Sequence, residues 1–428
     1  MVASMVKGPV SHAPPRQDRS GDPVPPARRA LRVLFFGEGS TLAHAARPLA
    51  LAAALPRDRF EVFLATPERY RPWTPEAVQW LPLEAQPPEV FAERLRAGRP
   101  LYTQARLETY VAEDLATIQE IRPDVVIGDF RLSLAASARS AQVPYINISN
   151  AYWSPDRPLR PVLPTVDFFP GWPRPAAEAA SKLLLPLALR WHAKQVDELM
   201  AAHGLERIGR DLRRAFTEAD ITLYADLPGL FPDVVETPQR RFLGPVAWEP
   251  PTAPPAWWED VPEDKPIAYV TLGSSGETQT LGRITAWLVD MGYVVLVATA
   301  GRARLEGDGQ RLFVADFLPG SAACELADLV VCNGGSPTTT QALLKGRPVL
   351  GVASNMDHFL NIRAVRAQGA GAGLRADRLT RRGFQHAVNR LAGFRAARAA
   401  AALATQGRAQ SPGRVLIEAI EALAGRSG

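Results

Sequence analysis

The chain has 428 residues, which predicts two domains at the usual ~100–200 residues per domain. Hydrophobic residues make up 46% of the chain and charged residues 22%, which is enough apolar material for full cores and excludes a disordered or fibrous protein. The 49 basic and 44 acidic residues leave a net charge of +5, too small over this length to indicate a nucleic-acid partner. The two cysteines, Cys324 and Cys332, offer no disulfide framework and no metal-ligand spacing, which fits a reducing cytoplasm.

The N-terminal segment, residues 1–28, contains six prolines and no Phe, Trp or Tyr. Such a segment buries too little apolar surface to fold, so we expect a flexible tail and not a secretory signal. No run of the chain reaches the ~18 apolar residues that a membrane span needs. The apolar run at 183–189 could lie against a membrane surface, but few basic residues flank it. We therefore expect at most peripheral membrane contact.

From residue 30 onward, apolar runs alternate with helical patterns. Because these runs are continuous and do not alternate with polar residues, they predict a parallel sheet covered by helices on both faces. The alternation is interrupted at 152–175, where Pro, Trp and Phe crowd together. The predicted strands are 31–36, 60–65, 123–129, 144–148, 221–224 and 242–245. The predicted helices are 43–55, 104–120, 133–141 and 176–202.

Residues 246–262 combine tryptophans and prolines without periodicity, which indicates a linker between two domains. A second strand–helix series follows, with predicted strands at 267–272, 293–297, 312–314, 329–332 and 348–351. Each series opens with a strand, a Gly/Ser turn and a helix. This pattern predicts two similar Rossmann-like domains facing across a cleft, with ligands bound at the carboxyl ends of the strands.

The stretch 332–343 (CNGGSPTTTQAL) is the most informative part of the chain. It places a Gly–Gly turn and several hydroxyls between a strand end and a helix start. Glycine lets the backbone approach a ligand closely, and the next amides point outward at a helix N-terminus, which suits a phosphate or diphosphate. An ordinary Ser or Thr N-cap is the alternative interpretation.

Three pieces of sequence together resemble the donor-binding region of the family 1 (UDP-glycosyltransferase-like) GT-B glycosyltransferases. They are residues 333–341, then 346–348 (GRP), then 355–361 (NMDHFLN), against a family pattern of roughly H-G-G-x-G-T-x-x-E-A-L, G-x-P and D-Q-x-x-N. The resemblance covers most of residues 30–428 and is most specific for 267–375.

The resemblance implies an α/β protein of the GT-B fold. It implies an acceptor-binding domain at 29–245, a nucleotide-sugar-binding domain at 263–395 and C-terminal helices at 396–428 that cross back to the first domain. The implied activity is inverting transfer of a hexose from a UDP- or dTDP-linked sugar to a small lipophilic or aromatic acceptor, such as a natural product or lipid. Neither a metal nor a further cofactor is expected.

The chain departs from the family pattern at several donor positions. Asn333 replaces a His that contacts the diphosphate, and Gln341 replaces a Glu that accepts from the ribose hydroxyls. Pro337 removes one backbone donor from the turn. By resemblance, Phe317 and Leu318 belong to the turn that binds the nucleobase. The donor-binding residues that the resemblance implies are Ser274, Ser275, Phe317, Leu318, Asn333, Gly334, Gly335, Ser336, Thr338, Thr339, Gln341, Asp357 and His358.

His44 follows the first Gly/Ser turn, where the family places its catalytic base, although Pro48 comes one residue later than in the family pattern. Asp129, at the end of the third predicted strand, resembles the carboxylate that orients this histidine. An imidazole titrates near neutral pH and can accept the proton of an attacking hydroxyl, while an aspartate fixes its tautomer. The alternatives are a His that lines a groove and an Asp that caps the following helix.

The interrupted stretch near residues 152–175 is rich in aromatic side chains. In the family this region lines the acceptor pocket, and an apolar lining favours a lipophilic or aromatic acceptor. Packing of the long helix into the core is the alternative explanation. The acceptor-binding residues that the resemblance implies are Tyr152, Trp153, Phe168, Phe169 and Trp172.

Three other functions remain open at this stage. Gly37 and Gly39 could begin a dinucleotide fingerprint, but Leu42 occupies its third glycine position, which weakens an oxidoreductase interpretation. A sugar-nucleotide epimerase of GT-B shape would use carboxylates in the cleft instead of a His–Asp pair. A non-catalytic nucleotide-sugar binding protein would bind the donor without turnover, and the replacements at Asn333 and Gln341 leave it possible.

Overall fold

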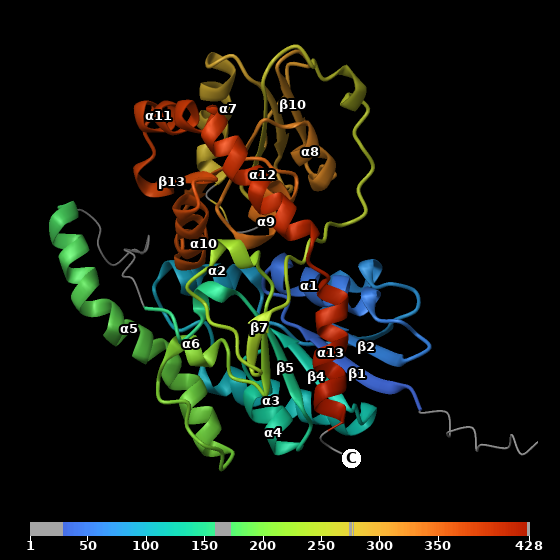
Figure 1. The fold of residues 1–428 in the computed structure, drawn as a ribbon. Helices are drawn as coiled ribbons and strands as arrows, with labels where there is room; N and C mark the ends of the chain where they lie inside the picture. The colour runs from blue at the N-terminus through green and yellow to red at the C-terminus, as the bar shows by residue number, and fades with distance from the viewer. Residues whose placement is uncertain (1–28, 159–172, 274–275, 277, 426–428) are drawn as a thin grey trace, which may run out of the picture.

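The structure is a computed structural model that describes residues 29–158, 173–273, 276 and 278–425. It has two lobes, one above the other in Figure 1, and each is built on a parallel β-sheet with helices on both faces. This arrangement confirms the predicted α/β class. The predicted tail at 1–28 lies outside the described residues.

The lower lobe in Figure 1 holds a seven-stranded sheet with the order β3-β2-β1-β4-β5-β6-β7. The order reverses at β1 and β4, so the carboxyl ends of these two central strands form the crevice where ligands bind in such sheets. In the register of this pair, Gly37 lies beside Asp129. The strands are β1 (Leu31–Gly37), β2 (Phe60–Thr66), β3 (Gln79–Pro82), β4 (Val125–Asp129), β5 (Tyr145–Ser149), β6 (Ile221–Tyr224) and β7 (Arg240–Phe242).

Alternate residues of β1 point to opposite faces of the sheet and enter two separate cores. Val33 and Phe35 pack with helix α1 and with α13 at the C-terminal end of the chain. Leu34 and Phe36 pack with α3 and α4 on the other face. The helices of this lobe are α1 (Leu42–Ala54), α2 (Pro88–Arg96), α3 (Gln104–Ile121), α4 (Leu134–Ser140), α5 (Arg174–Ala202) and α6 (Leu212–Ala215).

The upper lobe holds a six-stranded sheet with the order β10-β9-β8-β11-β12-β13. Its strands are β8 (Ile267–Thr271), β9 (Val294–Ala298), β10 (Leu312–Ala315), β11 (Leu329–Cys332), β12 (Val349–Ala353) and β13 (Gly371–Arg375). Its helices are α7 (Leu281–Asp290), α8 (Gly320–Leu326), α9 (Ser336–Leu344), α10 (Met356–Ala367) and α11 (Arg381–Leu391).

The last two helices lie on different lobes. Helix α12 (Phe394–Arg408) packs against α9 of the upper lobe, and α13 (Pro412–Ala424) packs against α1 and β4 of the lower lobe. Leu416 and Ile420 of α13 are fully buried in the same core as β1. The chain therefore returns to the lobe in which it began.

Five α-helices and strands of the described residues were not expected from the sequence, namely β3, α2, α6, α11 and β13, and one strand is shifted. The segment predicted as a strand at 242–245 is paired only up to Phe242. Gly244 has φ +94° and Pro245 follows it, so the backbone leaves the extended conformation there. The strand β3 lies at the sheet edge and is half exposed, so it lacks the continuous apolar run that marks the central strands.

Candidate active site between the lobes

His44 lies in the first turn of α1 and faces the end of β4. A side chain at Gly37 would lie 3.1 Å from the carbonyl oxygen of His44, so the glycine lets α1 pack directly against the end of β1. Nδ1 of His44 lies 2.8 Å from Oδ1 of Asp129, which is fully buried. The ionised carboxylate only accepts hydrogen bonds, so Nδ1 carries the proton and Nε2 is the ring atom left to accept one.

Arg47, one helical turn after His44, holds the same carboxylate. Its Nε donates to Oδ2 of Asp129 over 2.6 Å and its Nη2 donates to Oδ1 over 2.7 Å. This bidentate pair is buried, and its fork geometry fixes the plane of the carboxylate. Nη2 also lies 3.1 Å from Nδ1 of His44; because both nitrogens donate to Oδ1, this short distance reflects a shared acceptor.

The imidazole of His44 stacks on one aromatic ring. Phe130 stacks on His44 with ring centroids 4.3 Å apart and an angle of 12° between the rings. Phe130 has φ +60°, a left-handed conformation that is uncommon for a bulky residue and that tends to occur at functional sites. This backbone turn brings the ring back over the histidine directly after Asp129.

A cavity opens beside His44, and its lining is partly aromatic and partly polar. Its wall includes two of the predicted acceptor-binding residues, Tyr152 and Trp153, which belong to the short 3-10 helix η2 (Ala151–Trp153). Phe216 packs edge-on against Trp153 at 4.7 Å. The upper lobe contributes Asp357 to the same wall. The predicted acceptor residues Phe168, Phe169 and Trp172 lie outside the described residues.

Two side-chain hydrogen bonds join the lobes at this cavity. Nε1 of Trp153 donates to Oδ1 of Asp357 over 2.9 Å. Nδ2 of Asn150 donates to Oγ of Ser336, the first residue of α9, over 3.2 Å. The same Asn150 amide donates to Asp226 over 3.0 Å. The start of α9, which is the predicted diphosphate site, therefore lies against the end of β5 in the lower lobe.

The predicted diphosphate turn has the conformation that its glycines suggest. Gly334 has φ +83°, and its carbonyl accepts a 2.8 Å hydrogen bond from Nδ2 of Asn361. The Gly335 amide donates to Oδ1 of Asn333 over 2.9 Å. Pro337 occupies the first turn of α9, where a missing N–H costs no helical hydrogen bond. The turn thus places the N-terminus of α9 toward the gap between the lobes.

Four other predicted donor residues differ in their exposure. Thr338 is partly exposed on the first turn of α9, whereas Thr339 is 1% exposed and its hydroxyl lies 3.9 Å from Sγ of Cys332 in the core. Leu318 is buried and Phe317 is 54% exposed at the end of β10. Ser274 and Ser275 lie outside the described residues.

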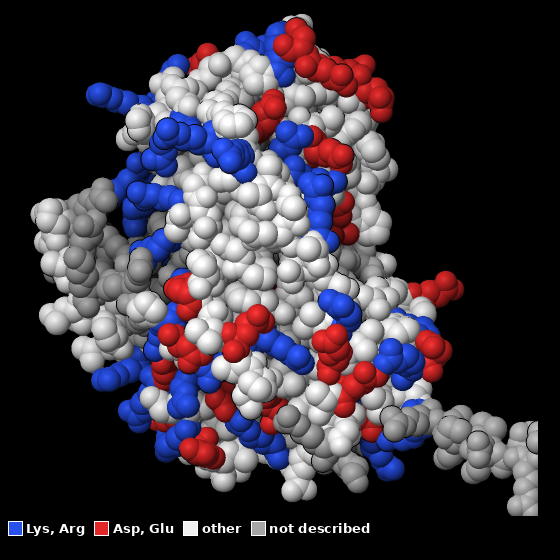
Figure 2. All heavy atoms as spheres, in the orientation of Figure 1, with Lys and Arg blue, Asp and Glu red and all other residues white. Residues whose placement is uncertain are grey.

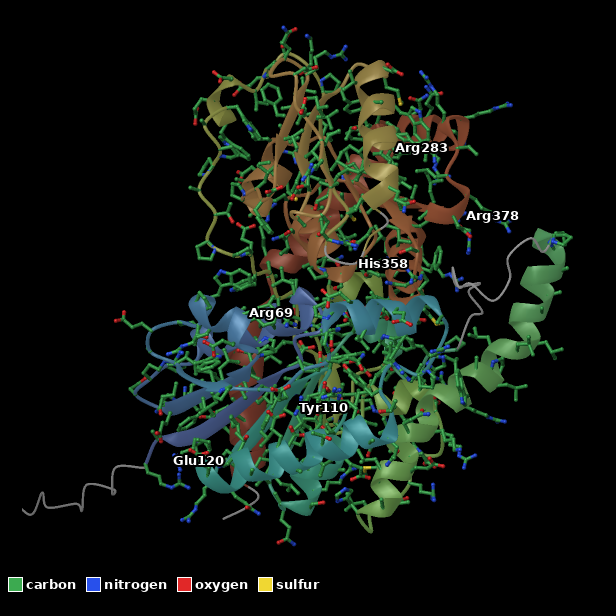
Figure 3. The ribbon with its side chains drawn as sticks, turned by 180° about the vertical axis from the view of Figure 1, so that it is seen from behind. Arg69, Tyr110, Glu120, Arg283, His358 and Arg378 are labelled. Atoms are coloured by element: carbon green, nitrogen blue, oxygen red, sulfur yellow. The ribbon has the colours of Figure 1, made fainter. Side chains whose placement is uncertain are left out.

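His358 packs behind the Gly334–Gly335 turn. Figure 3 shows it in the part of the upper lobe that faces the lower lobe. It is 4% exposed, and a side chain on Gly335 would lie 3.7 Å from its ring. Burial lowers the pKa of His358 to about 3, so its ring is neutral in the folded protein at ordinary pH.

Burial acts in the opposite direction on two carboxylates at the lobe interface. It raises the pKa of Asp226, which is 1% exposed, above its usual range. It likewise raises the pKa of Asp357, an effect that is opposed by the hydrogen bond from Trp153 and by the charge of Arg47. Asp357 lines the cavity, and Asp226 accepts a hydrogen bond from Asn150, which also lines it. Shifted pKa values of this kind are common at functional sites.

Gln341, which was expected to contact the ribose of the donor, forms a hydrogen bond with another side chain of the protein. Its Nε2 donates over 3.1 Å to Oε2 of Glu249, a residue of the predicted linker that also accepts from the Ser321 amide at 2.7 Å. A carboxylate is therefore present beside position 341, although a different segment supplies it. Sequence reasoning missed Glu249 because a linker position carries no signal.

Sequence reasoning also missed the polar residues that connect the His44–Asp129 pair to the interface between the lobes. Arg47 could have been found from its i, i+3 spacing to His44, which places both on one face of a helix. Asn150 directly follows β5 and Asp226 lies two residues after β6, at the carboxyl ends where functional side chains of a parallel sheet gather. Within the described part of the chain, no group of three or more His, Cys, Asp or Glu residues could hold a metal ion, and no helix is long and apolar enough to cross a membrane.

Comparison with known proteins gives a consistent result. The family model described as "Erythromycin biosynthesis protein CIII-like, C-terminal domain" matches residues 284–423. The chain is 44% identical over 370 residues to the PGL/p-HBAD biosynthesis glycosyltransferase of Mycobacterium tuberculosis (strain ATCC 25177 / H37Ra), covering 86% of each chain. It is 43% identical over 363 residues to the PGL/p-HBAD biosynthesis rhamnosyltransferase of Mycobacterium bovis (strain BCG / Pasteur 1173P2), covering 82% of this chain and 79% of the relative. Among solved structures, spinosyn rhamnosyltransferase SpnG complexed with thymidine diphosphate matches with a TM-score of 0.64 and 20% identity, over 91% of this chain and 99% of that one.

Proposed function

Because this chain belongs to the GT-B glycosyltransferases of the family 1 type, with relatives in PGL/p-HBAD biosynthesis, we propose a specific reaction for it. It moves a hexose from a UDP- or dTDP-linked sugar to a small lipophilic or aromatic acceptor, with inversion at the anomeric carbon. The acceptor is a natural product or lipid, and PGL/p-HBAD biosynthesis, for which both relatives are named, is its proposed source. Glycosyl transfer is favoured over the epimerase and binding-protein alternatives because the relatives are named glycosyltransferases.

The observation that carries the proposal is the contact between His44 and Asp129 at the mouth of a partly aromatic cavity. Nε2 of His44 takes the proton of the acceptor hydroxyl as that oxygen forms a bond to the anomeric carbon. Asp129 accepts a hydrogen bond from Nδ1–H and, with its negative charge, stabilises the imidazolium that forms. The ring stacking with Phe130 and the fork of Arg47 keep both groups in this orientation.

The bond from the anomeric carbon to the diphosphate breaks in the same step, and its electron pair goes to the leaving oxygen. The Gly334–Gly335 turn and the hydroxyl of Thr338 lie at the N-terminus of α9, where negative charge is stabilised. Ser274 and Ser275 join this set by resemblance. No metal is needed in this scheme, since helix N-terminal amides take the charge that grows on the diphosphate.

Asp357, His358, Gln341, Phe317 and Leu318 complete the proposed donor site. Asp357 already lies in the wall of the cavity, where a carboxylate can accept hydrogen bonds from sugar hydroxyls. His358 supports the Gly334–Gly335 turn from behind, and Gln341 acts together with its neighbour Glu249. The exposed ring of Phe317 offers a surface for a base to stack on.

We further propose that the enzyme works in the cytoplasm, with at most peripheral membrane contact and without a nucleic-acid partner. Cys324 and Cys332 are buried free thiols, which suits a reducing compartment. Basic and acidic side chains are mixed over the lower lobe on the face seen in Figure 2, in contrast to a nucleic-acid-binding surface.

A thermal-shift screen with UDP-, dTDP- and GDP-linked sugars, followed by mass spectrometry of acceptor mixtures, tests this function. A rise in melting temperature with one donor class and a new product heavier by one hexose support it. A new nucleotide sugar formed without any acceptor would indicate an epimerase. Donor binding without any product would indicate a binding protein.

A further inference from the structure

The inference concerns a chain of buried polar side chains that links the catalytic pair to the other lobe. The ion pair with Asp129 uses Nε and Nη2 of Arg47, and the remaining guanidinium nitrogen, Nη1, donates to Oδ1 of Asn150 over 2.9 Å. Arg47, Asp129 and Asn150 are each less than 10% exposed. Buried groups of this kind are costly to leave unpaired, so each member constrains the position of the next.

The neighbours of the Asn150 amide determine its orientation. Its Oδ1 must face Arg47, because a guanidinium only donates, and its Nδ2 must face Asp226, because an ionised carboxylate only accepts. The Asp226 carboxylate is itself fixed by a 2.6 Å hydrogen bond from the Ala151 amide. The second proton of Nδ2 therefore has a defined direction, and it points across the gap to Ser336.

Ser336 begins the helix whose N-terminus forms the proposed diphosphate site. The Asn150–Ser336 bond exists only while the two lobes are together, because the two residues belong to different sheets and are 186 positions apart. The interface hydrogen bond between Ser336 and Asn150 is thus linked, through Arg47, to the Asp129 carboxylate that contacts His44.

We propose that Asn150 is a positioning residue that couples docking of the donor turn to the orientation of the His44–Asp129 pair through Arg47. This inference rests on the proposed function, since it assumes that His44 takes the acceptor proton. With the lobes together, the chain is complete and Asp129 is held in one plane. With the lobes apart, the amide loses one partner, the constraint on Arg47 loosens, and proton abstraction slows. A base that is ordered only when donor and lobes are in place also limits attack of water on the sugar.

Steady-state kinetics of Ser336→Ala, Asn150→Ala and the double variant test the coupling. Each single change is expected to lower kcat by ~10–10²-fold, the scale of a small misplacement of a catalytic group. For Asn150→Ala, the acceptor KM and the thermal shift produced by the donor nucleotide should stay close to the wild-type values, because this change disturbs only the transition state. The double variant should be no slower than the slower single variant, because both changes interrupt one chain.

Two controls separate positioning from general damage. Ser336→Thr keeps the hydroxyl and should restore turnover relative to Ser336→Ala. Thr222→Val removes a buried hydrogen bond of the same sheet, from Oγ1 to the Thr217 carbonyl at 2.6 Å, that has no part in the chain, and it should leave kcat unchanged. Ser336→Ala alters only one interface hydroxyl, so it remains informative if Asn150→Ala does not fold.

The coupling is overturned if wild-type enzyme transfers sugar and Ser336→Ala keeps wild-type kcat. It is also overturned if the two single effects multiply in the double variant, or if Ser336→Ala changes only the donor KM. If the wild-type chain binds a donor and transfers nothing, both the proposed function and the coupling fall.

Discussion

Trp153 in the lower lobe donates its indole N–H to the carboxylate of Asp357 in the upper lobe over 2.9 Å. Both residues line the cavity beside His44, so the shape of this cavity depends on how the lobes meet. Asp357 is the second residue of helix α10. The same helix carries Asn361, whose side-chain amide donates to the Gly334 carbonyl. The cavity wall and the Gly334–Gly335 turn are therefore parts of one connected structure.

Replacing Trp153 by phenylalanine should test this connection. The ring contact with Phe216 is kept, but the Asp357 carboxylate loses a donor while it stays buried. A hydrogen bond to a charged group contributes ~1.5–3 kcal/mol, so we expect kcat/KM for the acceptor to fall by about tenfold or more. Trp257→Phe is the matched control, because that indole donates to the Val314 carbonyl away from the cavity. Equal effects of the two changes on kcat/KM would contradict the prediction.

His44→Ala should lower turnover by ~10²–10⁴-fold, the usual contribution of a general base. The nucleotide-induced thermal shift should stay the same, because His44 belongs to the acceptor side. His203→Ala is a suitable control: Nε2 of His203 lies 3.0 Å from Oε2 of Glu108, a similar pair on the surface of the lower lobe. Unchanged turnover in His44→Ala would exclude the histidine as the base.

Gly335→Val combined with Thr338→Val should abolish protection of the protein by the donor nucleotide against heat. A side chain at Gly335 meets Oδ1 of Asn333 at 3.1 Å, and the valine methyls extend further into the space proposed for the diphosphate. Gly282→Ala is the control, since nothing lies within 4 Å of an added Cβ there. Protection that survives the double change would place the donor elsewhere.

His358→Gln should flatten the pH dependence of stability on the acid side. The pKa of His358 is lowered to about 3 from the ordinary 6.5, so between these values the unfolded chain binds one proton that the folded chain does not. The free energy of unfolding therefore decreases as the pH falls through this window, by ~1.4 kcal/mol per pH unit for one proton.

Urea unfolding of wild type and His358→Gln at several pH values between 4 and 7.5 checks this prediction. The difference in free energy of unfolding between the two proteins should narrow or reverse toward low pH, because glutamine takes up no proton. The exposed His386, changed to Gln, provides the control. Parallel curves for wild type and His358→Gln would show that the histidine is not held neutral.

The sequence was sufficient to predict the architecture, because continuous apolar runs such as β4 and β11 can be stable only inside a parallel sheet. The resemblance to the family also implied that His44 and Asp129 would lie close together, and the structure places them 2.8 Å apart, with Asp129 at the end of β4 beside β1. Their catalytic roles stay a prediction. The edge strand β3 was missed because half-exposed edges carry mixed residues.

The polar links between the lobes could not be predicted, and the reason is geometric. Asn150 and Ser336, or Trp153 and Asp357, meet only because two separately folded sheets adopt one relative orientation. No periodicity or spacing within either half encodes that orientation. Arg47 was overlooked for a different reason: an arginine on a helix usually faces solvent, and only the structure shows its charge buried against Asp129.

The return of α13 to the lower lobe means that the polypeptide passes between the lobes twice, once through residues 246–262 and once between α12 and α13. Two connecting segments let the lobes open and close, but they restrict rotation of one lobe relative to the other. A protease that cuts one of the two crossings would yield fragments that remain associated in native buffer and come apart only in denaturant.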